Sequence, residues 1–185
     1  MIQNKDFNYS LHFITFQSNF IIVFDEIKCS IDNIDYIEKS YCYIDKTGEF
    51  MNADIQMKKE VQEMRFDFAI YVIKADKSVL TAFKADGVNY CTLKQDSIIV
   101  APLFKVLFDS LEKSGKLPKG CPIPADYHYR YYNMSVNTDL LPANIRKLGF
   151  KTSLVYYNRK TRFLSISTMG KVNPTKIKNK GRKSS

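Results

Sequence analysis

Four cysteines are spread through a chain in which one strand-like segment follows another. They are Cys29, Cys42, Cys91 and Cys121, in 185 residues. An even number of cysteines in a small strand-rich domain is typical of a disulfide-bonded fold, and disulfides persist in oxidising compartments. The cysteines therefore predict an extracellular β-domain. Four reduced, buried thiols are the alternative, whereas the absence of a C-x-x-C pair or closely spaced histidines disfavours zinc.

A regular alternation between residues 64 and 73 gives the clearest strand signal. Every second residue is apolar, which is the period of a β-strand: Met64, Phe66, Phe68, Ile70 and Val72. Shorter segments with strand character follow one another along the chain, separated by turn residues such as those at 45–48 and 76–78. The expected fold is mainly β, an antiparallel β-sandwich or β-cup of about seven strands.

One main helix is expected near residues 97–113. Apolar side chains recur there at helical spacing, and Gly115 can end the helix in a left-handed turn. Pro102 lies inside this span, which predicts either a kink or a later helix start. The helix would cover the mouth of a cup.

Tyrosines crowd the segment 127–136. Strict alternation places Tyr127, Tyr129 and Tyr131 on one face of a strand. The other face would then carry His128, Arg130, Tyr132, Met134 and Val136. Such a stripe is a stacking platform for sugars or bases, or simply one face of a sheet, and we favour the sheet.

The net charge of +9 is concentrated at the carboxyl end. Residues 171–185 contain six basic and no acidic residues, which leaves +3 for residues 1–170. We expect a basic, disordered tail at 171–185, with binding to an anionic surface as the alternative. The single folded domain is expected at 20–170, preceded by a degenerate signal peptide or disordered segment at 1–19.

The order of these features resembles a known insect family. The motifs are Phe24-Asp25-Glu26-Ile27-Lys28-Cys29, then Cys42, then the strand at 64–73 before Asp86-Gly87-Val88-Asn89-Tyr90-Cys91, and then Gly120-Cys121-Pro122 after a helix. They resemble the secreted four-cysteine family that includes the chemosensory B proteins of flies. That family is similar to the ganglioside activator protein and lies close to the ML-type lipid-recognition β-cups.

The resemblance implies an extracellular protein, without enzymatic activity or cofactor, that binds or presents a lipid or other hydrophobic ligand. Its setting would be chemosensation, such as pheromone perception, and a receptor would be a natural partner. The ligand would contact one wall of the cup and the helix: Met64, Phe66, Phe68, Ile70, Val72, Leu103, Val106 and Leu107. A secreted module that binds a protein partner through a filled core is the alternative.

Three further site predictions follow. Four cysteines allow three pairings, and our hypothesis is Cys91–Cys121 with Cys29–Cys42. The first pair would close a loop of about 30 residues and the second one of about 13. Asn133 begins an Asn-x-Ser glycosylation motif and is expected to face solvent. His128 lacks any recognisable nucleophile motif around it, so no catalytic residue and no metal site are predicted.

Overall fold

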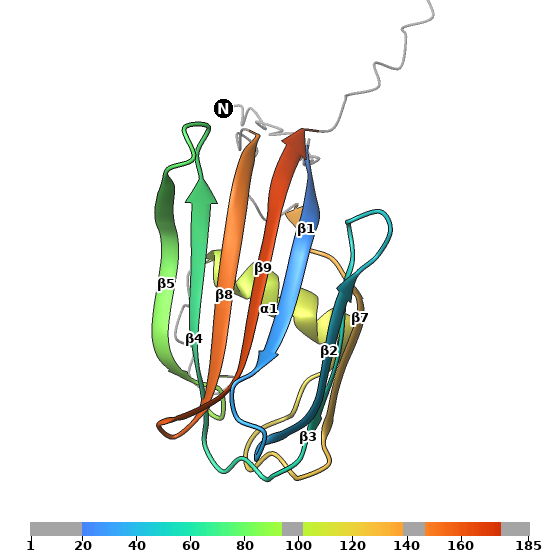
Figure 1. The fold of residues 1–185 in the computed structure, drawn as a ribbon, viewed down its shortest axis with the longest axis vertical. Helices are drawn as coiled ribbons and strands as arrows, with labels where there is room; N and C mark the ends of the chain where they lie inside the picture. Colours follow the sequence, from blue (N-terminus) through green and yellow to red (C-terminus); the bar gives the residue numbers. More distant parts are fainter. Residues whose placement is uncertain (1–19, 94–101, 139–146, 175–185) are drawn as a thin grey trace, which may run out of the picture.

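Two antiparallel sheets and one helix form the computed structural model, which describes residues 20–93, 102–138 and 147–174 (Figure 1). Sheet A has five strands in the order β1-β9-β8-β4-β5, and sheet B has four in the order β2-β3-β7-β6. The mainly β fold class is therefore confirmed. The strands of sheet A are β1 (Phe20–Ile31), β4 (Met64–Ile73), β5 (Val79–Asn89), β8 (Leu148–Asn158) and β9 (Thr161–Pro174). Those of sheet B are β2 (Ile37–Ile44), β3 (Met51–Met57), β6 (Gly115–Lys116) and β7 (His128–Met134).

Strand β4 carries the alternation that the sequence shows most clearly. It pairs with β8 on one side and with β5 on the other, so its backbone is bonded along both edges. Met64, Phe66 and Phe68 are at most 7% exposed, whereas Arg65 between them is exposed. The expected turn follows, because Asp76 accepts hydrogen bonds from the amide and the hydroxyl of Ser78 at 2.8 and 2.6 Å.

Helix α1 (Pro102–Ser114) lies behind sheet A and beside β7 (Figure 1). Proline is tolerated in the first turn of a helix, where its missing amide proton has no intrahelical partner. Pro102 is the first residue of this helix that the structure describes. Residues 97–101 of the predicted helix lie outside the described residues.

Strand β7 does not keep the strict alternation that we expected. Met134 pairs with Met51 and Tyr131 pairs with Ala53, so β7 has one residue more than β3 across the same stretch. The extra residue is a β-bulge at Asn133, whose φ is +53° and whose amide donates to Asn52 Oδ1 at 3.0 Å. The bulge returns Met134 to the inner face with Tyr131, so the prediction that placed Met134 and Val136 on the opposite face is wrong.

Strand β9 extends beyond the boundary that we set for the basic tail. Lys171 pairs with Val23 and Pro174 with Phe20, so residues 171–174 belong to the sheet and not to a tail. At the other end, β1 is described from Phe20 onwards. The segments 1–19 and 175–185 lie outside the described residues.

The most fully buried side chains gather at one end of the sandwich. This is the end where β2, β4 and β9 begin and β3 ends, at the bottom of Figure 1. Ile37 pairs with Met57 there, and Val61 forms a bridge with Ile123. The largest side chains less than 2% exposed are Phe163, Ile37, Met57, Met64, Ile123 and Val61. This dense packing closes one end of the space between the layers, and we call it the closed end.

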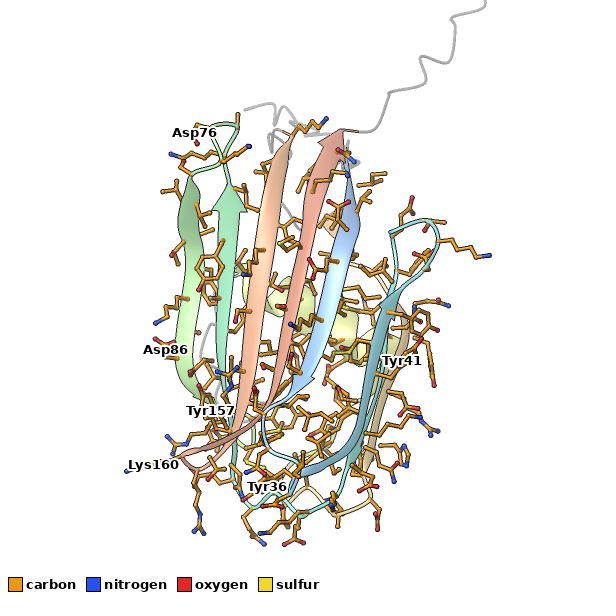
Figure 2. The ribbon with its side chains drawn as sticks, viewed as in Figure 1. Tyr36, Tyr41, Asp76, Asp86, Tyr157 and Lys160 are labelled. Carbon is orange, nitrogen blue, oxygen red and sulfur yellow. A yellow bond between two sulfur atoms is a disulfide. The ribbon has the colours of Figure 1, made fainter. Side chains whose placement is uncertain are left out.

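The outer faces are polar by contrast, with some exposed tyrosines. Figure 2 shows Tyr41 on β2 pointing away from the molecule, and its ring is 57% exposed. Tyr132 on β7 is also exposed, at 52%. Substitutions at these exposed tyrosines can therefore serve as controls for substitutions of inward-facing residues on the same strands.

Candidate ligand pocket

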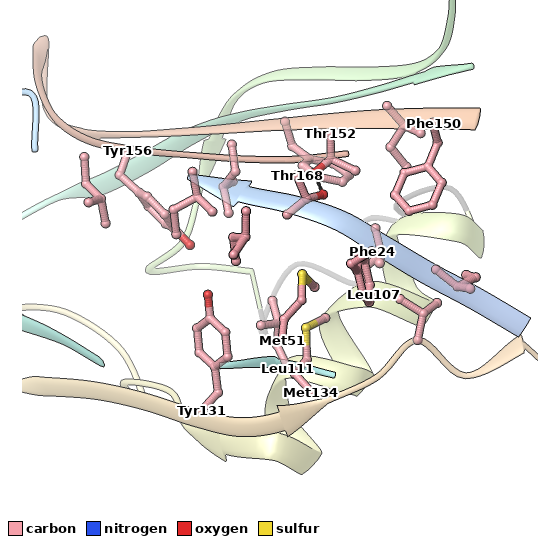
Figure 3. Close-up of a pocket in the computed structure, with 18 of the residues that line it drawn as sticks. Phe24, Met51, Leu107, Leu111, Tyr131, Met134, Phe150, Thr152, Tyr156 and Thr168 are labelled. Carbon is pink, nitrogen blue, oxygen red and sulfur yellow. Dashed lines mark hydrogen bonds between the residues drawn. The ribbon is translucent and has the colours of Figure 1, made fainter. Parts of the chain in front are cut away.

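An apolar cavity of about 270 Å³ lies between sheet A on one side and sheet B with α1 on the other (Figure 3). This volume is just below the range of about 300–1,000 Å³ usual for small-molecule pockets. It exceeds the roughly 150 Å³ of an engineered apolar cavity that stays dry and binds benzene. The cavity is partly open and not sealed on all sides.

Nearly all of the lining is aliphatic, aromatic or methionine side chains. Sheet A contributes Ile22, Phe24, Ile27, Met64, Phe68, Ile70, Val72, Ala82, Leu148, Phe150, Thr152, Leu154, Tyr156, Phe163, Leu164, Ile166, Thr168 and Val172. The opposite side contributes Met51, Ile55, Met57, Leu107, Leu111, Leu117, Tyr129, Tyr131, Met134 and Val136. Among the described residues, no charged side chain lines the cavity.

Most of the side chains predicted from β4 reach this cavity. Met64, Phe68, Ile70 and Val72 line it, together with Leu107 of α1. Phe66 does not: it is 4% exposed and packs in the core, with its ring centroid 6.2 Å from that of Tyr156. Leu103 and Val106 belong to α1, but their side chains lie outside the described part of the chain.

Several lining residues were not predicted. Phe24 of β1 and Phe150 of β8 meet edge to face with ring centroids 6.0 Å apart, above Leu107 (Figure 3). Met134 was assigned to the wrong face because the bulge at Asn133 cannot be read from periodicity. Both phenylalanines follow the alternation of their own strands, so the signal was present for them but did not distinguish pocket from packed core.

The hydroxyl-bearing side chains of the lining fall into two groups. Thr152 and Thr168 bond each other, Oγ1 to Oγ1, at 2.7 Å, and Tyr129 contacts Met64 Sδ at 3.6 Å. Tyr131 and Tyr156 differ, because neither hydroxyl forms a hydrogen bond with any described residue. Figure 3 shows both hydroxyls pointing into the space between the layers.

These two tyrosines sit in a strongly apolar setting. Burial raises the pKa of the Tyr131 hydroxyl, and burial followed by the proximity of Tyr131 raises the pKa of the Tyr156 hydroxyl. Both therefore stay protonated at neutral pH and keep their ability to donate a hydrogen bond. Each hydroxyl is a polar group in a site that is otherwise hydrophobic.

Both disulfide bonds of the proposed pairing are present. Cys29 in β1 joins Cys42 in β2 and so links sheet A to sheet B, with 13 residues of sequence separation. Cys91 joins Cys121 across 30 residues and links the chain after β5 to the loop before β7. No free cysteine occurs in the described residues, so the reduced-thiol alternative is wrong for this structure.

The other sequence-based candidates take up places away from the cavity. Asn133 is exposed at the bulge of β7, as the glycosylation prediction requires. His128 lies at the surface, with Nδ1 3.5 Å from Asp54 Oδ1 and 3.2 Å from an Arg130 nitrogen. No cluster of three metal-ligating side chains is found within the residues described.

The tyrosine stripe divides between the inside and the outside of the molecule. Tyr127 and Tyr129 meet edge to face at 5.1 Å, while Tyr129 and Tyr131 face the cavity. Only Tyr132 is largely exposed among the tyrosines of β7. The structural interpretation of the stripe is therefore the right one, because Tyr129 and Tyr131 are not available as a surface platform.

Fold and cavity together define an antiparallel β-sandwich with an apolar pocket between its layers. A family model described as "Protein of unknown function (DUF1091)" matches residues 64–152. The match runs from the start of β4 into β8 and so includes part of both pocket walls. No curated protein matches the chain.

None of the helices in the described ranges is long and apolar enough to cross a membrane.

Proposed function

We propose that this protein binds a lipid or another hydrophobic small molecule between its two sheets and presents it outside the cell. The observation that carries the proposal is the apolar cavity of about 270 Å³. Transfer of apolar surface from water into such a site is favourable and largely independent of orientation. Methionines such as Met51 and Met134 add adaptable side chains that fit ligands of varied shape.

An extracellular location is supported by the two disulfide bonds, because such bonds persist in oxidising compartments. The narrower role in chemosensation, such as the perception of pheromones, rests on the resemblance to the chemosensory B proteins. In that role the protein would hold an apolar signal molecule and deliver it to a receptor. We also propose that the protein is not an enzyme.

The alternative is a secreted module that binds a protein partner and needs no ligand. That alternative requires a core that its own side chains fill. Cores of folded proteins pack at nearly crystalline density and contain few voids larger than a water molecule. A cavity of this size among 28 lining residues favours the ligand-binding proposal over the filled core.

Octane is a suitable first probe because it is neutral, volatile and purely apolar. We expect it to partition from the headspace into a solution of the protein. Each methylene buried contributes about 0.8 kcal/mol, which corresponds to roughly a fourfold gain in affinity. Hexane, which is two methylenes shorter, should therefore bind roughly fifteenfold more weakly than octane.

A matched pair of substitutions tests whether octane occupies this cavity. Met134→Trp places a large ring in the cavity and should abolish octane uptake. Tyr132→Trp, on the outward face of the same strand, should leave uptake unchanged because Tyr132 is 52% exposed. Equal uptake by wild-type protein and both variants would place the octane elsewhere and refute the proposal.

A further inference from the structure

The hydroxyls of Tyr131 and Tyr156, which form no hydrogen bond with a described residue, indicate the kind of ligand, and this inference rests on the proposed function. We propose that the pocket takes an uncharged oxygen-bearing lipid, such as an alcohol, ketone or ester, whose oxygen lies between the hydroxyls of Tyr131 and Tyr156. Its hydrocarbon chain then extends toward Leu107, Phe24 and Phe150. The ligand is therefore amphipathic and neutral, and it binds in one direction.

The first step is the unusual position of the two hydroxyls. A buried hydroxyl without a hydrogen-bond partner is destabilising, so such groups are rare in folded proteins. The other hydroxyls in the lining already have contacts: Thr152 bonds Thr168, and Tyr129 contacts Met64. Tyr131 and Tyr156 form no hydrogen bond with a described residue. Tyr131 is nevertheless a buried residue, with only 9% of its surface exposed.

The second step concerns access. Within the part of the chain described, the side-chain oxygens and nitrogens that are fully buried and form no hydrogen bond are Ser40 Oγ and Asp54 Oδ1, and the latter still pairs with Arg130 at 3.5 Å. Neither tyrosine oxygen is among them, so each keeps some surface open to the cavity. Both groups are therefore accessible to a ligand in the cavity, and they come from opposite walls, β7 and β8 (Figure 3).

The third step excludes a charged head group. A carboxylate or ammonium moved into an apolar site needs an opposite charge or several strong hydrogen bonds to offset its lost hydration. No lysine, arginine, aspartate or glutamate belongs to the described lining. Both tyrosines are protonated donors at neutral pH, and a neutral carbonyl or hydroxyl oxygen can accept from each of them.

The fourth step gives the direction of binding. Tyr156 stacks on Phe163, whose side chain belongs to the closed end, with ring centroids 6.2 Å apart. At the other end of the cavity the lining consists of hydrocarbon side chains such as Val72, Leu148 and Val172. The oxygen therefore lies deep in the pocket, and the hydrocarbon chain lies toward the end remote from Phe163.

The test compares octanol, octane and octanoate on the full chain. Octane bound to the protein is followed in the headspace, and octanol and octanoate are measured as competitors. The variants are Tyr131→Phe, Tyr156→Phe and the double variant, which remove one oxygen each and keep the ring. Tyr132→Phe is the control, because it makes the same change on the exposed face of β7.

We expect each Tyr→Phe substitution in the pocket to weaken octanol about tenfold, while octane affinity stays the same or rises slightly. Octanoate should compete more weakly than octanol with the wild-type protein, and Tyr132→Phe should change nothing. Equal effects on octane and octanol, no effect on octanol, or stronger competition by octanoate would overturn the inference. Failure of octane to bind the wild-type protein would refute the proposed function itself, so the two failures are distinguishable.

Discussion

At the scale of single residues, local irregularities such as β-bulges determine which side chains face the pocket. The positive φ of Asn133 adds a residue to β7 and turns Met134 inward. Alternation predicted the inner face of β4 well because β4 runs without a bulge against β8. A bulge leaves no reliable mark in the sequence, so the face of Met134 could not be predicted.

Gly170 is a second residue whose role only the structure reveals. It pairs with Phe24 on β1 and with Phe150 on β8, two strands on either side of β9. A Cβ atom at this position would lie 2.4 Å from the carbonyl oxygen of Val23 and 2.8 Å from the Phe150 ring. The missing side chain leaves room for the Phe150 ring, which lines the pocket.

Gly170→Ala should therefore destabilise the protein by about 1–3 kcal/mol, because backbone on one side and a packed ring on the other resist the added methyl group. Gly120→Ala is the control, since a Cβ there meets nothing within 4 Å, and its effect should stay within about 0.5 kcal/mol. Urea unfolding measures both. Equal stability of the two variants would contradict this account of Gly170.

At the scale of elements, the disulfides join segments that are not neighbouring strands of one sheet. Cys29–Cys42 links two sheets, and Cys91–Cys121 links the end of β5 to the approach to β7. The cysteine count and the strand pattern were enough to predict a disulfide-bonded β-domain. The helix was predicted as well, and the described helix, Pro102–Ser114, matches the predicted segment from residue 102 to its end.

The longer loop should make the larger contribution to stability. Loop entropy gives about 3–4 kcal/mol for the 30-residue separation of Cys91 and Cys121, against about 3 kcal/mol for the 13-residue separation of Cys29 and Cys42. We expect the double serine variants to lose about these amounts in urea unfolding. A loss below about 1 kcal/mol for Cys91→Ser with Cys121→Ser would show that this bond adds little to the fold.

At the scale of the whole molecule, two layers of unequal length explain why a cavity exists. The strands of sheet A that cover it are long, for example 12 residues in β1 and 14 in β9. Sheet B is shorter, with 8 residues in β2 and 7 in β3 and in β7. Sheet B therefore covers only part of the inner face of sheet A, and α1 covers more of it through Leu107 and Leu111.

This unfilled space could not have been predicted from the sequence. Core strands and pocket strands have the same alternation, because both need an apolar inner face. Met64 and Phe66 illustrate the limit: both are buried on β4, yet only Met64 lines the cavity. Which inward side chain faces a void depends on how the opposite layer is placed, and this is set by contacts between residues far apart in the chain.

Native mass spectrometry of the protein secreted from insect cells, purified without organic solvent, tests the central claim most directly. We predict a mass four protons below that of the reduced chain, together with one neutral apolar adduct that is removed by solvent extraction. The Met134→Trp variant should carry the same two disulfides and no adduct. A wild-type protein that is oxidised but free of any adduct, and that takes up no octane after extraction, would contradict the account.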